Sequence, residues 1–224
     1  MIYQREREAV CQMAIRMWQA GLVVGSAGNI SVRAPDAGRF VITPSSIAYD
    51  ELTATQVVVV DDDGDLLDDD DLEDGETFER APSFETPIHL AVYAARPDVA
   101  AIVHTHSRAA TAMALARMSI PPVVDEMVVH LGGPVDVAAY GMSGSDELAD
   151  AVVETLGERS AVLLAAHGVL TTGKDLRKAF KNAELVEHVA HIVATARALG
   201  GEPPALPDDV LEAERQMYAI VKTM

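Results

Sequence analysis

Apolar residues recur along the chain with two different periods, and these periods predict its helices and strands. Between residues 5 and 20 they return every three or four positions, which predicts a helix with one apolar stripe. A second helix is expected to end near residue 95, with Thr86 as its N-cap and Pro87 as its first helical residue. Four more helices are expected over residues 108–118, 145–156, 175–199 and 207–223.

Short runs rich in β-branched and other apolar residues separate these helices and predict strands. They cover residues 30–33, 40–43, 56–60, 101–106, 128–131, 135–139 and 160–166. The alternation of strands and helices favours an α/β fold in which helices cover a sheet. Because no linker divides the 224 residues, we expect a single domain over residues 1–224.

Two histidines close the strand predicted over residues 101–106, and they carry the strongest chemical signal in the chain. Alternate side chains of a strand share a face, so His104 and His106 should point the same way. Two imidazoles on one face are two of the three protein ligands of a typical catalytic zinc site. His167 ends another apolar run and is the candidate third ligand. Three imidazoles leave one coordination position open for substrate or water, as a catalytic site requires.

Glu85 is the best candidate for a catalytic base, and it lies 19 residues before His104. The alternative is a carboxylate in the first turn of a helix that only complements the helix dipole. His89 follows four residues later, so it could hydrogen-bond Glu85 or merely pack. Spacing alone leaves both alternatives open.

Three further histidines give weaker signals. His188 and His191 are three residues apart on a predicted helix, but their surroundings do not match the zincin motif, so an ordinary helix face is favoured. His130 stands alone and is expected to be a core or surface residue.

Composition excludes several classes of protein. Hydrophobic residues make up 49% of the chain, enough for a sizeable core, and the single cysteine, Cys11, excludes an internal disulfide and a cysteine-built zinc site. The formal net charge of −18 makes nucleic acid an unfavourable partner. No signal-peptide core and no membrane-length apolar run is found, so we expect a cytoplasmic protein without a membrane partner.

Residues 61–74 form an acidic block with nine aspartates and one glutamate. A solvated hairpin or loop is the favoured interpretation. A calcium loop of the EF-hand type is rejected, because Gly64 occupies the fourth position from Asp61 and the twelfth position, Leu72, is apolar.

Two loops, residues 25–29 and 45–46, are rich in small and hydroxyl-bearing residues. Their backbone N–H groups and hydroxyls can hold a phosphate. Neither loop matches a Walker or dinucleotide-binding motif, so ordinary turns remain the alternative.

Taken together, these features resemble the class II aldolase/adducin-head family over about residues 1–199. Five motifs occur in the family's order, at residues 25–33, 42–52, 82–85, 104–106 and 167–171. The resemblance implies a three-layer α/β/α sandwich with a mostly antiparallel central sheet. It also implies a C4 homotetramer with active sites at the subunit interfaces.

The resemblance assigns a role to each motif. His104, His106 and His167 fall on the zinc-ligand positions, and Glu85 falls on the acid/base position. The family's phosphate pocket maps to Gly28, Asn29, Ser45, Ser46 and Ser83.

Two positions depart from the pattern of the aldolases in this family. Phe84 stands where they carry a second serine, which removes a hydroxyl donor and adds bulk. Residues 124–127 contain no tyrosine, although the aldolases place a tyrosine of the neighbouring subunit in that region.

The expected function is that of a zinc-dependent class II aldolase, with another divalent transition metal as a possible replacement for zinc. Such an enzyme cleaves a small sugar phosphate or related hydroxy-ketone, such as fuculose 1-phosphate, through an enediolate. The mechanism suggests that burial raises the pKa of Glu85 toward neutrality. The alternatives are an epimerase, dehydratase or decarboxylase of the same family, or a non-catalytic oligomerisation module like the adducin head.

Overall fold

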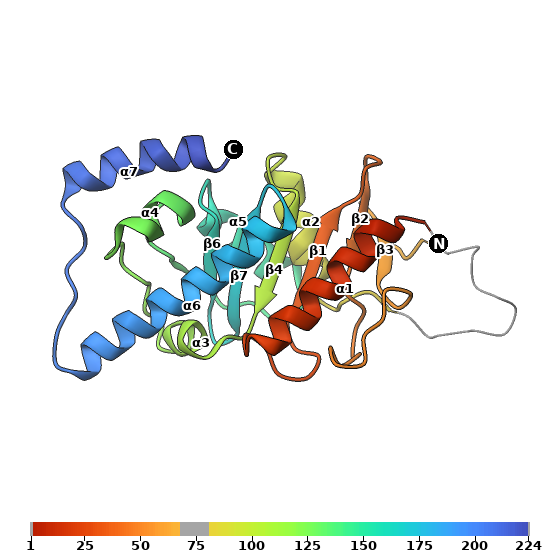
Figure 1. Cartoon of the computed structure of the whole chain (residues 1–224), viewed down its shortest axis with the longest axis horizontal. Helices are drawn as coiled ribbons and strands as arrows, with labels where there is room; N and C mark the ends of the chain where they lie inside the picture. Colours follow the sequence, from red (N-terminus) through yellow and green to blue (C-terminus); the bar gives the residue numbers. More distant parts are fainter. Residues whose placement is uncertain (1, 68–80, 224) are drawn as a thin grey trace, which may run out of the picture.

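The computed structural model describes residues 2–67 and 81–223, and these build one seven-stranded sheet in the order β3-β2-β1-β4-β7-β6-β5 (Figure 1). All neighbouring strands are antiparallel except β5 and β6, which are parallel. The strands are β1 (Asn29–Arg33), β2 (Arg39–Ile42), β3 (Val58–Asp61), β4 (Ala101–Thr105), β5 (Val137–Ala138), β6 (Ala161–Leu164) and β7 (Gly168–Gly173).

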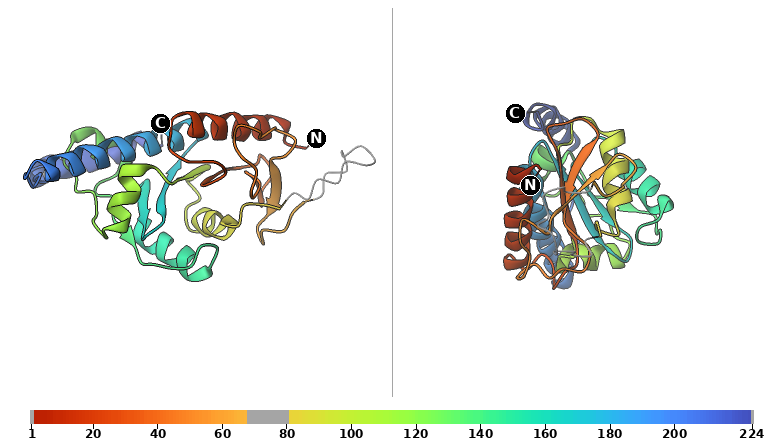
Figure 2. Two further views of the ribbon diagram at one scale, coloured as in Figure 1. Left: turned by 90° about the horizontal axis from the view of Figure 1, so that it is seen from below. Right: turned by 90° about the vertical axis from the view of Figure 1, so that its right-hand side faces the viewer.

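Helices cover both faces of this sheet, which confirms the expected three layers. Figure 2 shows the sheet edge-on, with α1 (Gln4–Gln19) and α6 (Leu176–Ala198) on one side and α2 (Thr86–Ala95) and α5 (Asp146–Leu156) on the other. The remaining helices are α3 (Arg108–Leu115), α4 (Asp125–Leu131) and α7 (Asp208–Val221). No helix within residues 2–67 and 81–223 combines the length and apolarity that crossing a bilayer requires.

The period-two pattern of the strands divides the core between the two faces of the sheet. Ile30 and Val103 pack in the cluster that α1 and α6 cover, whereas Ile42 and Ile102 pack in the cluster under α2 and α5. His104 follows Val103 by one residue, so the strand alternation turns it toward the α2 face. The hydrophobic pattern therefore decides on which side of the sheet polar chemistry can be built.

One predicted strand is wrong, because residues 128–131 belong to helix α4. The run of valines favoured a strand, but Asp125 and Glu126 suit a helix N-terminus and Gly132, at φ 91°, ends the helix in the left-handed region. Met127 and Leu131, four residues apart, are buried on one side of α4.

Two further strand predictions need correction. Of residues 135–139 only Val137 and Ala138 form a strand, while Val135 makes an isolated bridge with Ile120. Strand β7 was not predicted at all, because its sequence Gly-Val-Leu-Thr-Thr-Gly is bounded by glycines and is too short to show a period. It is nevertheless central in the sheet and fully buried.

The predicted helix caps are partly confirmed. Ser145 accepts a hydrogen bond from the Leu148 N–H at 3.2 Å, as an N-cap should. Thr86 is not the N-cap of α2: it is the first helical residue, and Glu85 holds the cap position without capping through its side chain. That leaves the Glu85 carboxylate available for other partners.

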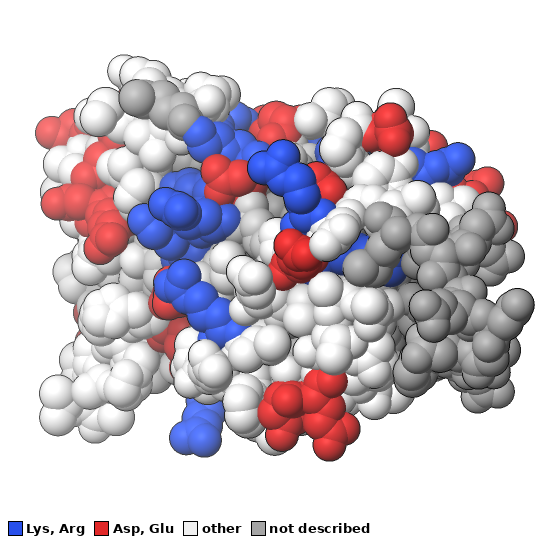
Figure 3. Space-filling view, turned by 45° about the vertical axis from the view of Figure 1, so that its right-hand side comes forward, with Lys and Arg blue, Asp and Glu red and all other residues white. Residues whose placement is uncertain are grey.

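The acidic block begins as a tight turn. The Asp61 carboxylate accepts hydrogen bonds from the N–H groups of Asp63 and Asp65, and Val60 bridges to Leu66. Residues 68–74 of the block lie outside the described residues. On the face shown in Figure 3, Lys and Arg side chains gather near the middle, with acidic side chains around them, so the net negative charge is unevenly distributed.

Candidate active site

Three imidazoles meet at one end of the central strands. His104 is in β4, His106 follows that strand, and His167 lies in the turn between β6 and β7. The Nε2 atoms of His104 and His106 are 2.9 Å apart, so both side chains point the same way as predicted. The ring centroid of His167 lies 4.8 Å from that of His104 and 4.9 Å from that of His106. The structure therefore brings together residues that are up to 63 positions apart.

The backbone sets the orientation of the most buried imidazole. His104 Nδ1 lies 3.0 Å from the Val169 carbonyl oxygen, which can only accept a hydrogen bond. Nδ1 therefore carries a hydrogen, and Nε2 is left to face the other imidazoles. This is the usual arrangement of a histidine that ligates a metal through Nε2.

Two glycines allow the strands that carry the histidines to approach closely. A Cβ on Gly168 would lie 2.3 Å from the Thr105 carbonyl oxygen and 2.9 Å from Cδ2 of His106. A Cβ on Gly28 would lie 2.5 Å from the His104 carbonyl oxygen, and its φ of 73° is in the left-handed region. Any side chain at these positions would push β4 or its imidazoles out of place.

The Glu85 carboxylate completes the cluster. Its Oε2 lies 3.2 Å from His104 Nε2 and its Oε1 lies 3.1 Å from His167 Nε2. Asn29 Nδ2 donates to Oε2 at 2.8 Å, and the Ser143 hydroxyl donates to Oε1 at 2.7 Å. Glu85 is therefore more than a first-turn carboxylate that complements the helix dipole.

The electrostatics of Glu85 differ from the sequence-based expectation. Burial raises its pKa, but the attraction of His104 and His167 and their hydrogen bonds outweigh burial and hold the pKa below its ordinary value. Burial lowers the pKa of His104, but the attraction of neighbouring Glu85 outweighs burial and holds that pKa above its ordinary value. Burial, together with His104 and His167, lowers the pKa of His106 to about 3. Glu85 is thus ionised and His106 neutral near pH 7.

The donor set fits a divalent transition metal. One ligand atom from each of Glu85, His104, His106 and His167 lies within 4.8 Å of the others. Two imidazole nitrogens 2.9 Å apart require a shared hydrogen or a cation between them, because two lone pairs repel. Three imidazole nitrogens suit zinc, and imidazole also suits copper, iron and nickel.

A cavity of about 230 Å³ opens beside this cluster. It is lined by all five residues that the resemblance assigns to a phosphate pocket, namely Gly28, Asn29, Ser45, Ser46 and Ser83, and by Glu85, His106 and His167. Phe84 and Ser143 line it as well, and Phe84 is 67% exposed. Asn29 Nδ2 donates to Glu85 and Asn29 Oδ1 contacts His89, so the hydroxyls of Ser45, Ser46 and Ser83 are more available as donors toward the cavity.

Sequence reasoning missed Ser143 and left His89 open. Ser143 lies in a Gly-Met-Ser-Gly loop with no periodicity and no motif, so no local signal could have assigned it. His89 does not bond Glu85: its Nε2 lies 2.6 Å from Asn29 Oδ1 and its Nδ1 lies 2.6 Å from Ser31 Oγ. The four-residue spacing indicated that Glu85 and His89 face the same way, but it could not indicate that Asn29 lies between them.

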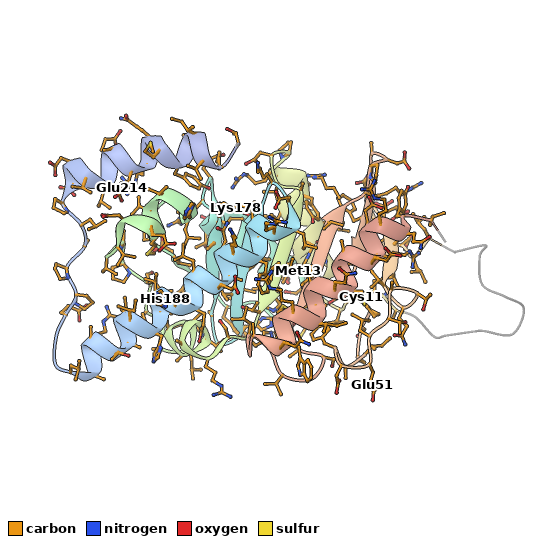
Figure 4. All side chains as sticks on the ribbon, in the orientation of Figure 1. Cys11, Met13, Glu51, Lys178, His188 and Glu214 are labelled. Atoms are coloured by element: carbon orange, nitrogen blue, oxygen red, sulfur yellow. The ribbon has the colours of Figure 1, made fainter. Side chains whose placement is uncertain are left out.

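The other histidines lie outside the cluster, as predicted. His188 and His191 are exposed on α6, where Figure 4 labels His188. His130 Nδ1 lies 2.9 Å from Lys178 Nζ, which Figure 4 also labels on α6. The buried Cys11 on α1 is a free thiol.

The close approach at Gly168 predicts that Gly168→Ala destabilises the fold. Because the added methyl group meets the Thr105 carbonyl, the free energy of unfolding should fall by about 1–3 kcal/mol, as is typical of overpacking. Urea unfolding measures the change. Gly201→Ala is the matched control, since its Cβ would meet only the Ala196 carbonyl oxygen at 3.4 Å. Equal stabilities of the two variants would contradict the steric argument.

Comparison with known proteins agrees with this geometry. The family described as Class II Aldolase and Adducin N-terminal domain matches residues 8–194. The 5-deoxy-D-ribulose 1-phosphate aldolase of Bacillus thuringiensis is 35% identical over 212 residues, 95% of this chain and 94% of that protein. The L-fuculose phosphate aldolase of Escherichia coli is 34% identical over 200 residues, 89% of this chain and 87% of that protein. A solved structure of L-fuculose 1-phosphate aldolase superposes with a TM-score of 0.88 at 32% identity, covering 98% of both chains. The chain therefore belongs to the class II aldolase and adducin family and is an enzyme of its aldolase type.

Proposed function

We propose that the chain is a metal-dependent aldolase that cleaves a small ketose 1-phosphate into an aldehyde and a three-carbon ketone phosphate. The observation that carries the proposal is the meeting of three imidazoles with Glu85 beside a serine-lined cavity. The names of two relatives suggest 5-deoxyribulose 1-phosphate and fuculose 1-phosphate as substrates. These two sugars differ in length and stereochemistry but share the ketone and the phosphate.

The metal ligands in this proposal are His104, His106 and His167, and the ion is Zn²⁺ or another divalent transition metal. When bound, such an ion acts as a Lewis acid that disperses the negative charge developing on the carbonyl oxygen of the substrate as the carbon–carbon bond breaks. The neutral state of His106 and the hydrogen bond from His104 Nδ1 to the Val169 carbonyl support the ligand roles.

Glu85 is the proposed proton carrier. Its carboxylate is ionised near pH 7, as a proton acceptor must be, and its place beside the cavity rather than its lowered pKa supports this role. Its side chain is buried, which limits competition from water, and it faces the cavity in which substrate would lie. Cleavage needs a proton removed from a substrate hydroxyl and one returned at the carbon next to the carbonyl.

The phosphate pocket in this proposal consists of Gly28, Asn29, Ser45, Ser46 and Ser83. Because the chain carries a formal net charge of −18, an anionic substrate must be held by local donors. The serine hydroxyls can supply such donors, and the hydrogen bond from the Tyr49 hydroxyl to the Gly28 carbonyl at 2.5 Å holds one loop in place. Phe84 adds an apolar wall beside them.

Product analysis tests the reaction type. We expect incubation of the metal-loaded enzyme with 5-deoxy-D-ribulose 1-phosphate or L-fuculose 1-phosphate to release a free aldehyde. An epimerase would change the stereochemistry of the sugar phosphate without releasing aldehyde, and a decarboxylase would release carbon dioxide from a carboxylated substrate. A non-catalytic module would leave both sugars unchanged, which would refute the proposal.

The three imidazoles should each be required for metal binding. We expect the purified wild type to contain about one divalent ion per chain, and His104→Ala, His106→Ala and His167→Ala to lose most of it along with activity. The fold should survive, because the core on both faces of the sheet is independent of these side chains. Elemental analysis measures the metal, and His188→Ala on the exposed side of α6 is the control. Unchanged metal in any one variant would remove that histidine from the ligand set.

Glu85→Gln should separate chemistry from metal binding. It keeps the size of the side chain but removes the proton acceptor, so kcat should fall by about 10²–10⁴-fold. KM should change less, because the lost interaction belongs to the transition state. Metal content should stay near the wild-type value, and exposed Glu154→Gln is the control for losing a carboxylate. Near-normal turnover with full metal would exclude Glu85 as the proton carrier.

We further propose that the chain forms a homotetramer with active sites at the subunit interfaces, and that it works in the cytoplasm. The assembly rests on the family resemblance, and exposed apolar side chains beside the cavity support it. Phe84 is 67% exposed and Met142, next to Ser143, is 69% exposed. Light scattering at working concentration should give about four chains per particle, and a stable monomer would contradict interface-built sites.

A further inference from the structure

Behind Glu85, a series of buried polar side chains leads away from the cavity into the protein. Asn29 and Ser31 come from β1, and His89 and Tyr93 come from α2. None of the four is more than 2% exposed. The contacts are 2.8 Å from Tyr93 Oη to Ser31 Oγ, 2.6 Å from Ser31 Oγ to His89 Nδ1, 2.6 Å from His89 Nε2 to Asn29 Oδ1, and 2.8 Å from Asn29 Nδ2 to Glu85 Oε2.

The spacing of the two elements explains why the series is continuous. Glu85 at the N-cap of α2 is followed at four-residue steps by His89 and Tyr93 within the helix. The three therefore lie on one face with a rise of about 6 Å between them. Asn29 and Ser31 are two residues apart on β1, so they share a face with a rise of about 6.6 Å. The two repeats nearly match, and the strand side chains therefore fit between those of the helix.

The hydrogens in this series can run in only one direction. Glu85 Oε2 accepts from Asn29 Nδ2, so Asn29 Oδ1 is the atom facing His89 and must accept from His89 Nε2. Burial lowers the pKa of His89 to about 3, so the ring is neutral and its Nδ1 accepts from the Ser31 hydroxyl. The single Ser31 hydrogen is then used, so Ser31 accepts from Tyr93.

The far end of the series is rigidly held. The Tyr93 ring stacks on Phe40 with centroids 4.8 Å apart, and the Arg33 guanidinium lies 4.6 Å from its centroid. Arg33 also donates to the Tyr93 carbonyl oxygen. Burial raises the pKa of Tyr93, so its hydroxyl keeps the hydrogen that it donates. Because Tyr93 is held in place, the series of hydrogen bonds that begins at its hydroxyl can orient the Glu85 carboxylate at the other end.

We propose that His89, supported by Ser31 and Tyr93, is a positioning residue that acts through Asn29 to hold the Glu85 carboxylate in its reactive orientation. This inference rests on the proposed role of Glu85 as the proton carrier. Besides the imidazoles of His104 and His167, two side chains donate to Glu85, and they differ in kind. Ser143 belongs to a half-buried loop, whereas Asn29 is fixed from within the fold. Asn29 is oriented by His89, because without a donor on its Oδ1 its amide could turn over and present an oxygen to the carboxylate.

The test compares two substitutions at position 89 in the metal-loaded full-length enzyme. His89→Leu removes both hydrogen bonds, and we expect kcat for 5-deoxy-D-ribulose 1-phosphate or L-fuculose 1-phosphate, whichever the wild type cleaves, to fall by about 10- to 100-fold. KM should change by less than about threefold, since a mispositioned base acts on the transition state. His89→Gln can still donate to Asn29 Oδ1 and should recover most of the loss.

Tyr93→Phe tests the far end of the series without a change of shape. It should lower kcat in the same direction as His89→Leu but by less. Tyr218→Phe is the matched control, because Tyr218 Oη lies 2.8 Å from the Ser160 hydroxyl, away from the candidate site. Both variants lose a buried tyrosine–serine hydrogen bond, and Tyr218→Phe also loses the bond from Tyr218 Oη to the Glu158 carbonyl oxygen at 2.8 Å. The thermal unfolding midpoint should therefore fall at least as far in Tyr218→Phe, with loss of kcat only in Tyr93→Phe.

A double-mutant cycle separates positioning from structural damage. If His89 acts through Glu85, then His89→Leu should cause little further loss of kcat when Glu85 is already Gln. Metal content per chain should be unchanged in every variant. A full additional loss in that background, or a loss of metal with His89→Leu, would overturn the proposal.

The outcomes also distinguish this inference from the proposed function. If Glu85→Gln is inactive but His89→Leu and Tyr93→Phe keep wild-type kcat, the positioning role is wrong and the proton carrier stands. If Glu85→Gln itself turns over normally, the proposed function fails first. Should His89→Leu not fold, the pair His89→Gln and Tyr93→Phe decides, since a wild-type kcat in Tyr93→Phe would overturn the role of the series.

Discussion

The pairing register of three neighbouring strands determines almost everything at the site. In the antiparallel ladders, Asn29 of β1 lies opposite His104 of β4, and His104 lies opposite Leu170 of β7. A shift of one residue would turn every side chain of a strand to the other face. Buried apolar residues on both faces of β4 oppose such a shift, because it would expose them to polar surroundings and bury the imidazole among apolar ones. The core thus fixes the chemistry by fixing the register.

Close backbone approach is the second requirement, and it couples the site to the loops around it. Gly28 and Gly168 lie against the carbonyl oxygens of His104 and Thr105, where no Cβ fits. The turn before Gly168 positions His167, and the loop before Asn29 lines the cavity. Loop geometry and imidazole geometry are therefore parts of one packing arrangement, and neither can change alone.

Burial gives the polar groups at this end of the sheet their properties. Away from water, a carboxylate stays ionised only if charges and hydrogen-bond donors stabilise it. Glu85 has such partners on both oxygens, with His104 and Asn29 on Oε2 and His167 and Ser143 on Oε1. The same burial keeps His89 neutral, which makes it both a donor and an acceptor. A charged His89 would break the one-directional series of hydrogen bonds. The series therefore depends on the low polarity of the interior.

Local patterns in the sequence determined a large part of this protein. The alternation of residues placed His104 and His106 on one face, the apolar run before His167 indicated a third imidazole, and most helices began and ended near their predicted bounds. These features depend on neighbours within a few positions, so period and capping chemistry suffice to predict them. Only tertiary structure decided that β7 forms a central strand. It alone placed Ser143 and Asn29 on the Glu85 carboxylate and His89 on Asn29, because such contacts join residues 56 to 60 positions apart whose meeting is set by sheet order and helix packing.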